Sequence, residues 1–173
     1  MHIETPRLTL RRFGAADGPA VHRYMGDPVV TQWLPRGLLD AAGARAFAER
    51  NAGRRPRALA VVERASGELI GHMDYHPWFG AREIGWAIGR PYQRQGYATE
   101  AARALLGHAF GTLHSHRVVA TCQPQNVASW RVMEKLGMRR EGHFLQHIRR
   151  DTGEWWDEYF YALLADEYFG GAT

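Results

Sequence analysis

Lysine and cysteine are nearly absent from this chain of 173 residues: Lys135 is the only lysine and Cys122 the only cysteine. A single cysteine excludes an internal disulfide framework, and its apolar neighbours Val118 to Ala120 predict a buried strand position rather than a reactive thiol. The positive charge is carried almost wholly by arginine, a side chain that favours planar anionic partners. The net charge of +4 therefore fits an anionic cofactor and leaves nucleic acid open.

Long apolar runs are also lacking. No segment approaches the roughly 20 apolar residues needed to span a bilayer. Residues 1–6 lack the basic and apolar regions of a signal peptide. We therefore expect no membrane contact and a cytoplasmic location. The arginines are scattered, apart from pairs such as Arg139-Arg140, so no dedicated nucleic-acid site is evident.

The length and the hydrophobic content of 45% predict one domain, residues 1–173, with a sizeable core and no repeats or low-complexity linker. Apolar residues alternate in the predicted strands and recur at helical spacing in the predicted helices, which together indicate a mixed α/β sheet. The strands are expected at residues 7–12, 58–63, 69–75, 83–88, 118–122, 138–148 and 155–163, and the helices near 17–25, 39–51, 99–110 and 128–136.

A glycine turn joins the predicted strand 83–88 to the long helix that follows it. The segment Gln93-Arg94-Gln95-Gly96-Tyr97-Ala98 feeds the helix N-terminus, where the first backbone N–H groups lack intrahelical partners and the dipole is positive. Gly96 permits close approach of a ligand, and Arg94 can add charge. The segment lacks the Gly-Lys-Ser/Thr ending of a P-loop and the three spaced glycines of a dinucleotide fold. It therefore predicts a phosphate site of another kind.

Two segments together resemble the GNAT N-acetyltransferase superfamily. Gln93, Gly96 and Ala98 fill the fixed positions of its acetyl-CoA pyrophosphate loop, and a second block runs from Asn126 to Met138 at the distance such proteins use. The opening residues 5–11 and the pair Asp27-Pro28 further resemble the ribosomal-protein N-terminal acetyltransferase (Rim-type) branch. The resemblance covers nearly the whole chain. It implies the GNAT acyl-CoA N-acyltransferase fold, with a mixed, mostly antiparallel sheet of about seven strands flanked by about four helices.

The resemblance also implies roles for individual residues. Acetyl-CoA would be the acetyl donor, with Asn126 on its pantetheine arm, Ser129 as the proton donor to the leaving thiolate and Glu83 as a candidate base. A main-chain N–H near Ala87 or Ile88 would support the oxyanion. The residues expected to contact the cofactor are Trp86, Ala87, Ile88, Gln93, Arg94, Gln95, Gly96, Tyr97, Ala98, Thr99, Asn126 and Ser129.

Each of these roles has a simpler structural alternative. Asn126 and Ser129 are also the residue types that cap a helix N-terminus. Glu83 could be a solvated charge at a strand end, its place as base taken by a water relay, and Trp86 and Ile88 could be core packing. The nine histidines form no complete metal-ligand set, so we expect no metal.

The predicted activity is transfer of an acetyl group to a primary amine by direct attack in a ternary complex. The acceptor would be a protein N-terminal α-amine or a small-molecule amine. The positive net charge disfavours polycationic acceptors unless the cleft is locally acidic. The alternative is a non-catalytic CoA sensor or a ribosome- or RNA-associated protein, against which Asn126 and Ser129 favour the enzyme. Strand edges could support a homodimer.

Overall fold

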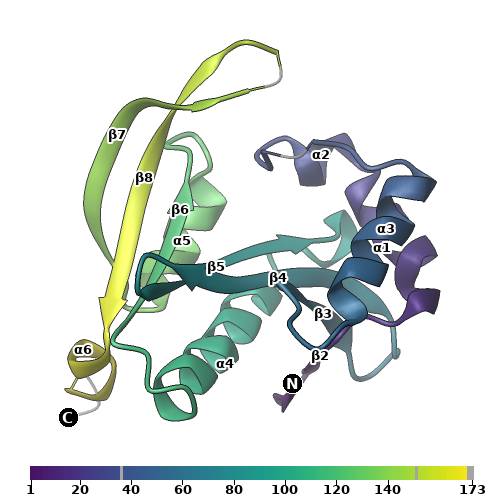
Figure 1. Ribbon diagram of the computed structural model, residues 1–173, viewed down its shortest axis with the longest axis horizontal. Helices are drawn as coiled ribbons and strands as arrows, with labels where there is room; N and C mark the ends of the chain where they lie inside the picture. The colour runs from purple at the N-terminus through teal and green to yellow at the C-terminus, as the bar shows by residue number, and fades with distance from the viewer. Residues whose placement is uncertain (36, 151, 171–173) are drawn as a thin grey trace. The chain divides into compact units, whose positions relative to one another are not determined.

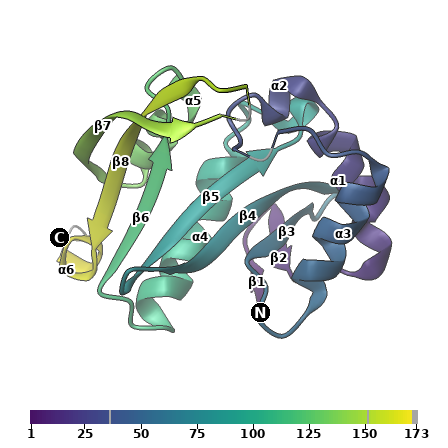
Figure 2. The ribbon, with the colours of Figure 1, turned by 45° about the horizontal axis from the view of Figure 1, so that its top comes forward.

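The computed structural model describes residues 1–35, 37–150 and 152–170 (Figures 1 and 2). The chain forms two compact units. The first comprises residues 1–76 and 85–105, and the second comprises residues 77–84 and 106–173. Strand β5 (Ala81–Ile88) and helix α4 (Tyr97–Gly111) each contribute residues to both units.

The first unit contains an antiparallel ladder of strands. These are β1 (His2–Glu4), β2 (Leu8–Arg11), β3 (Ala58–Glu63) and most of β4 (Leu69–Trp78), whose last two residues belong to the second unit. In β3, Ala58 and Ala60 alternate with Leu59 and Val61, and all four side chains are buried. Because successive residues of a strand point to opposite faces, both faces of the ladder are covered here.

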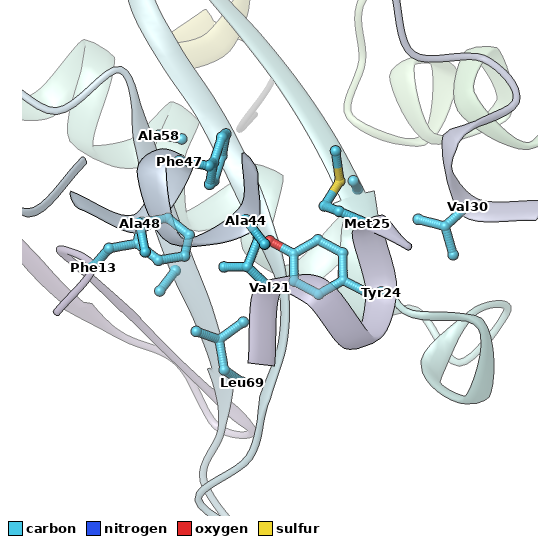
Figure 3. Packing of buried hydrophobic residues seen from close by; sticks show 12 residues of the cluster. Phe13, Val21, Tyr24, Met25, Val30, Ala44, Phe47, Ala48, Ala58 and Leu69 are labelled. Carbon is cyan, nitrogen blue, oxygen red and sulfur yellow. The ribbon is translucent and has the colours of Figure 1, made fainter. Parts of the chain in front are cut away.

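Helices α1 (Gly18–Met25) and α3 (Ala41–Ala52) pack together against one face of this ladder, near the short helix α2 (Pro28–Thr31). At the start of helix α3 the Asp40 carboxylate accepts a hydrogen bond from the Gly43 amide at 2.7 Å. This N-cap gives a partner to an amide that has none within the helix. The core beneath the helices gathers Val21, Tyr24 and Phe47 with Leu69 of β4, as Figure 3 shows. These helices therefore provide one wall of the first unit.

The second unit contains β6 (Arg117–Cys122), β7 (Arg139–Arg149) and β8 (Trp155–Leu164), with helices α5 (Val127–Lys135) and α6 (Ala165–Gly170). The start of β5 pairs parallel with β6, and β8 pairs antiparallel with both β6 and β7. A small core joins Trp78, Ala81, Val119 and Phe160. Cys122 is 4% exposed, which confirms its expected burial.

In the described part of the chain the sheet has eight strands in the order β1, β2, β3, β4, β5, β6, β8, β7, with six α-helices and the short 3₁₀ segments Ala15–Asp17 and Arg90–Tyr92. The expected mixed, mostly antiparallel sheet is confirmed, with one strand and two helices more than predicted. The additions are β1, α2 and α6, which are too short to give a periodic signal. Among the described residues, no helix has both the length and the apolar character needed to cross a membrane.

Candidate active site

The loop between β5 and α4 has a backbone that only a special sequence allows. Gln93 ends the 3₁₀ turn in an extended conformation, and its side-chain Nε2 donates to the carbonyl of Ile88 at 2.9 Å. Arg94 and Gly96 then take positive φ values of 62° and 84°. Such a φ is natural for glycine and strained for arginine, and strain of this kind gathers at functional sites.

The first turn of α4 presents backbone amides without protein acceptors. In the described ranges, no carbonyl or side chain accepts from the amides of Gly96, Tyr97 or Ala98, and the first amide with a partner is that of Glu100, which donates to the Gly96 carbonyl at 3.0 Å. Together with the positive end of the helix dipole, these amides form a site suited to an anion. The backbone is compatible with a phosphate site at residues 93–99, which stays a prediction.

Arg7, in the turn between β1 and β2, holds this loop in place. Its Nη1 donates to the Gln95 carbonyl at 3.0 Å, and its Nε donates to the Glu100 carboxylate at 2.6 Å. Its guanidinium also lies 4.4 Å from the centre of the Tyr97 ring. The same carboxylate accepts from the Thr5 hydroxyl at 2.6 Å and from the Arg7 amide at 2.9 Å.

The pKa of Glu100 is lowered from its ordinary value. Burial acts to raise it, but the hydrogen bonds from Thr5 and Arg7 outweigh burial. Sequence reasoning missed this support, because its members are about 90 residues apart and each is an ordinary surface residue type. The signal available was the segment Thr5 to Arg7, which entered only as a family resemblance.

The end of β5 approaches β4 very closely. A Cβ at Gly71 of β4 would lie 2.2 Å from the Ala87 carbonyl oxygen and 3.0 Å from the Ile88 Cα. The Ala87 side chain packs into the core under α1 and α3, and Ile88 is also buried, while Trp86 is half-buried. Ile88 is joined to the loop through Gln93. The predicted residues 86–88 and 93–99 are thus brought together in the first unit.

The remaining predicted residues belong to the second unit. Asn126 caps α5, since its Oδ1 and its carbonyl both accept from the Ser129 amide, at 3.3 and 3.0 Å. The Ser129 side chain is half-buried, and no described residue accepts from or donates to its hydroxyl. Glu83 is half-buried on β5 opposite Val119 of β6. The capping alternative for Asn126 therefore holds, and a cofactor role is compatible with it because its Nδ2 is not engaged by the cap.

The histidines of the hairpin β7–β8 pair with carboxylates. His143 Nε2 lies 3.0 Å from Asp157 Oδ2, and His147 Nδ1 lies 2.8 Å from Glu158 Oε2. Within the described ranges, no three His, Cys, Asp or Glu side chains are grouped so as to hold a metal ion. A cavity of about 330 Å³ in the second unit lies among Trp130, Glu134, Arg140, Tyr159 and Tyr161, and none of the predicted site residues lines it.

A second group that the sequence did not reveal lies inside the first unit. Tyr24 of α1 hydrogen-bonds His72 Nδ1 of β4 at 2.9 Å, and His72 Nε2 lies 3.6 Å from Asp74 Oδ2. His72 is 2% exposed, so this is a buried polar chain in an otherwise apolar core. Helix α1 and strand β4 are about 50 residues apart in sequence, and no local pattern announces the contact.

Comparison with known proteins decides the family. The profile of the acetyltransferase (GNAT) domain matches residues 7–139. The chain belongs to the GNAT acetyltransferase family. The GNAT fold inferred from residues 93–98 and 126–138 is thereby confirmed, as is an N-acetyltransferase activity, which in general requires an amine acceptor. GNAT enzymes generally use acetyl-CoA as the acetyl donor.

Three similar proteins illustrate this GNAT membership. The chain is 44% identical over 170 residues to the "uncharacterized N-acetyltransferase YnaD" of Bacillus subtilis strain 168, covering 97% of this chain and 99% of YnaD. The crystal structure of a GNAT-family acetyltransferase from Bacillus anthracis superimposes with a TM-score of 0.93 at 42% identity, over 96% of this chain and 100% of that one. The ribosomal protein uS5-alanine N-acetyltransferase of Escherichia coli K12 is 31% identical over 93 residues, 54% of this chain and 47% of that enzyme.

Proposed function

We propose that this GNAT enzyme transfers the acetyl group of acetyl-CoA to a primary amine by direct attack in a ternary complex. The observation that carries the proposal is the loop at residues 93–99. Its two left-handed residues lead into a helix N-terminus with three amides that have no acceptor among the described residues. Such a site binds a pyrophosphate through backbone N–H groups, and Arg94 adds a cation. The loop is held from behind by Arg7 and Glu100, so little ordering remains to be done on binding.

The residues present fit CoA on two grounds. Gly96 adopts without strain the φ of 84° that turns the chain into the helix N-terminus, where the free amides lie. Asn126 keeps its amide Nδ2 available beside its capping bond, as a donor to the pantetheine arm requires. When bound, acetyl-CoA supplies a thioester. The amine attacks its carbonyl carbon, and its sulfur is the leaving group.

The transfer forms a C–N bond and breaks a C–S bond, so a proton must leave the amine and a proton must reach the sulfur. We assign the second step to the Ser129 hydroxyl. A hydroxyl is a poor free acid, so its contribution is a concerted transfer that speeds the reaction without being indispensable. Glu83 is the proposed proton acceptor from the amine, directly or through water. The oxyanion would be supported by the main-chain N–H at Ala87 or Ile88.

For the acceptor we propose the α-amine at a protein N-terminus, as in the Rim-type branch. Support comes from residues 5–11 and from the E. coli relative, which is named as an N-acetyltransferase of alanine in ribosomal protein uS5. That likeness spans about half of each chain. Small-molecule amines are the alternative acceptors, and both belong in one assay.

The test is thiol release from acetyl-CoA by the purified protein, with N-terminal peptides, polyamines and aminoglycosides as acceptors. We expect acceptor-dependent turnover that falls about a hundredfold in kcat in Ser129→Ala, with CoA affinity by calorimetry unchanged. Ser115→Ala, on the loop before β6, is the matched control and should keep full turnover.

Three results would each count against a part of the proposal. Tight CoA binding without thiol release in the presence of any of the amines would indicate that this chain is a sensor rather than an enzyme. Unchanged kcat in Ser129→Ala would remove that residue from the reaction while leaving the transfer in place. For Glu83→Gln, a kcat equal to that of Glu49→Gln, an exposed helix control, would assign the amine proton to water.

A further inference from the structure

The polar chain Tyr24–His72–Asp74 runs from the core of the first unit toward its surface. Residues two apart in a strand share a face, so His72 and Asp74 project from the same side of β4. That side is covered by α1 and α3: Tyr24 contributes its hydroxyl, and the Phe47 ring lies 5.0 Å from the imidazole. The exposed fraction of the side chain rises from 3% at His72 to 36% at Asp74. The chain thus ends in a carboxylate that solvent reaches.

The proton of the Tyr24 hydroxyl stays on its oxygen. Burial, followed by the charge of Asp74, raises the pKa of the Tyr24 hydroxyl well above its ordinary value. Tyr24 therefore keeps its proton and can donate it to His72 Nδ1 at 2.9 Å. His72 Nε2 lies 3.6 Å from Asp74 Oδ2, which is beyond hydrogen-bond range but places the buried imidazole directly beside the carboxylate.

The Asp74 carboxylate lies over a strand that leads to the phosphate loop. A Cβ built on Gly85 of β5 would meet Asp74 Oδ2 at 3.4 Å and its Cβ at 3.5 Å. Because residue 85 is glycine, it has no side chain to separate the carboxylate from the backbone of β5 at this position. Ile88 lies three residues further, roughly 10 Å along an extended strand. Its carbonyl accepts a hydrogen bond from the side chain of Gln93, the first residue of the loop. Strand β5 therefore runs from a position beside the Asp74 carboxylate to the proposed cofactor loop.

We propose that Asp74 binds the cationic amino group of the acceptor, and that His72 and Tyr24 are positioning residues that fix its carboxylate. The proposal rests on the acetyl transfer proposed above. An amine in neutral water arrives as an ammonium ion, and this chain carries a net charge of +4 that would repel it. A local carboxylate backed by the buried imidazole offsets that repulsion and orients the nitrogen. It provides the local acidity that a positively charged enzyme needs for a cationic substrate.

The kinetic test compares two kinds of acceptor. Alkylamines are cations at neutral pH, whereas arylamines are uncharged there. In Asp74→Asn we expect KM for alkylamine acceptors to rise about tenfold to a hundredfold, with KM for acetyl-CoA and turnover of an arylamine unchanged. Tyr24→Phe, which removes one oxygen without changing the shape of the core, should raise the alkylamine KM less and in the same selective way. Asp166→Asn, an exposed carboxylate on α6, is the matched control.

A second readout is independent of turnover. In protein labelled with ¹⁵N-histidine, the His72 ring signals, assigned by their loss in His72→Gln, should shift when an alkylammonium salt is titrated in, and should not shift in Asp74→Asn. If the wild-type signals shift while no amine is acetylated, the amine site stands and the proposed transfer fails. If the wild-type His72 signals stay fixed at saturating amine, or if Asp74→Asn loses alkylamine and arylamine turnover equally, Asp74 is structural and the inference is wrong.

Discussion

Arg7 and Glu100, 93 residues apart in the chain, form an ion pair in which Arg7 Nε donates to Glu100 Oε2 at 2.6 Å. Glu100 stands in the first turn of α4, where a carboxylate is favoured by the helix dipole. Arg7 reaches from there to the Gln95 carbonyl. The pair therefore ties the N-terminal segment to both sides of the loop at residues 93–99. Its exposure differs between partners, 45% for the Arg7 side chain and 17% for Glu100, so solvent screens it only in part.

This pair predicts a pH-dependent contribution to stability. The pKa of Glu100 is lowered below its ordinary value of 4.5, so its stabilisation is present above that pH and is lost as the pH falls through the folded-state pKa. Glu100→Gln should lower the free energy of unfolding by about 1 kcal/mol at neutral pH. The difference from wild type should shrink below about pH 4. Urea unfolding at neutral pH and below about pH 4 measures this difference in the free energy of unfolding, with Glu49→Gln as the control. A difference that is the same at both pH values would contradict the assignment.

The loop at residues 93–99 was predictable because its chemistry is local. A strand pattern, a glycine turn and a helix pattern follow one another within a few residues, and a helix N-terminus exposes amides wherever it occurs. The cap at Asn126 is equally local. By contrast, the Arg7–Glu100 pair and the Tyr24–His72 bond join segments far apart in sequence. Only the folded chain brings such residues together.

The end of β4 shows a different limit of sequence reasoning. The strand predicted here ends at residue 75, two residues before Pro77, and proline lacks the N–H that a paired strand position needs. The strand instead continues to Trp78, and the reversal is confined to Phe79 and Gly80, whose φ values are 37° and 79°. Pro77 is tolerated because the pairing with β3 ends at Asp74. Trp78 packs on Phe160 at a ring distance of 5.2 Å.

Cys122 should be chemically silent. Burial, followed by the charge of Glu158, raises the pKa of its thiol to about 12. At pH 8 only about one molecule in ten thousand then carries the thiolate that reacts with alkylating agents. Iodoacetamide should leave the folded protein unmodified at pH 8 and modify it readily in urea, as mass spectrometry would record. Labelling of the folded protein at the rate seen in urea would show that the thiol is accessible.

Gly71 should be indispensable for the approach of β4 to β5. In Gly71→Ala the new methyl group would lie 2.2 Å from the Ala87 carbonyl oxygen, and a backbone atom cannot move aside as a flexible side chain can. We expect a loss of about 3 kcal/mol in the free energy of unfolding. Gly53→Ala is the control, because its methyl group would meet nothing within 4 Å and its φ of −71° suits alanine. Comparable unfolding midpoints for the two variants would refute the close contact.

Gly96 should be required for the cofactor rather than for folding alone, and Gly67 offers the means to separate the two effects. Both residues have positive φ, 84° at Gly96 and 71° at Gly67, so alanine at either costs about 1 to 2 kcal/mol of backbone strain. Gly67 lies in the turn between β3 and β4, where a methyl group would meet nothing within 4 Å. Gly96→Ala and Gly67→Ala should therefore lower the melting temperature by similar amounts. Only Gly96→Ala should raise KM for acetyl-CoA, about tenfold, since its strain is relieved by turning the loop amides away from the phosphate. An equal KM in the two variants would mean that the loop geometry does not determine cofactor affinity, and the binding site would have to be sought elsewhere in the first unit.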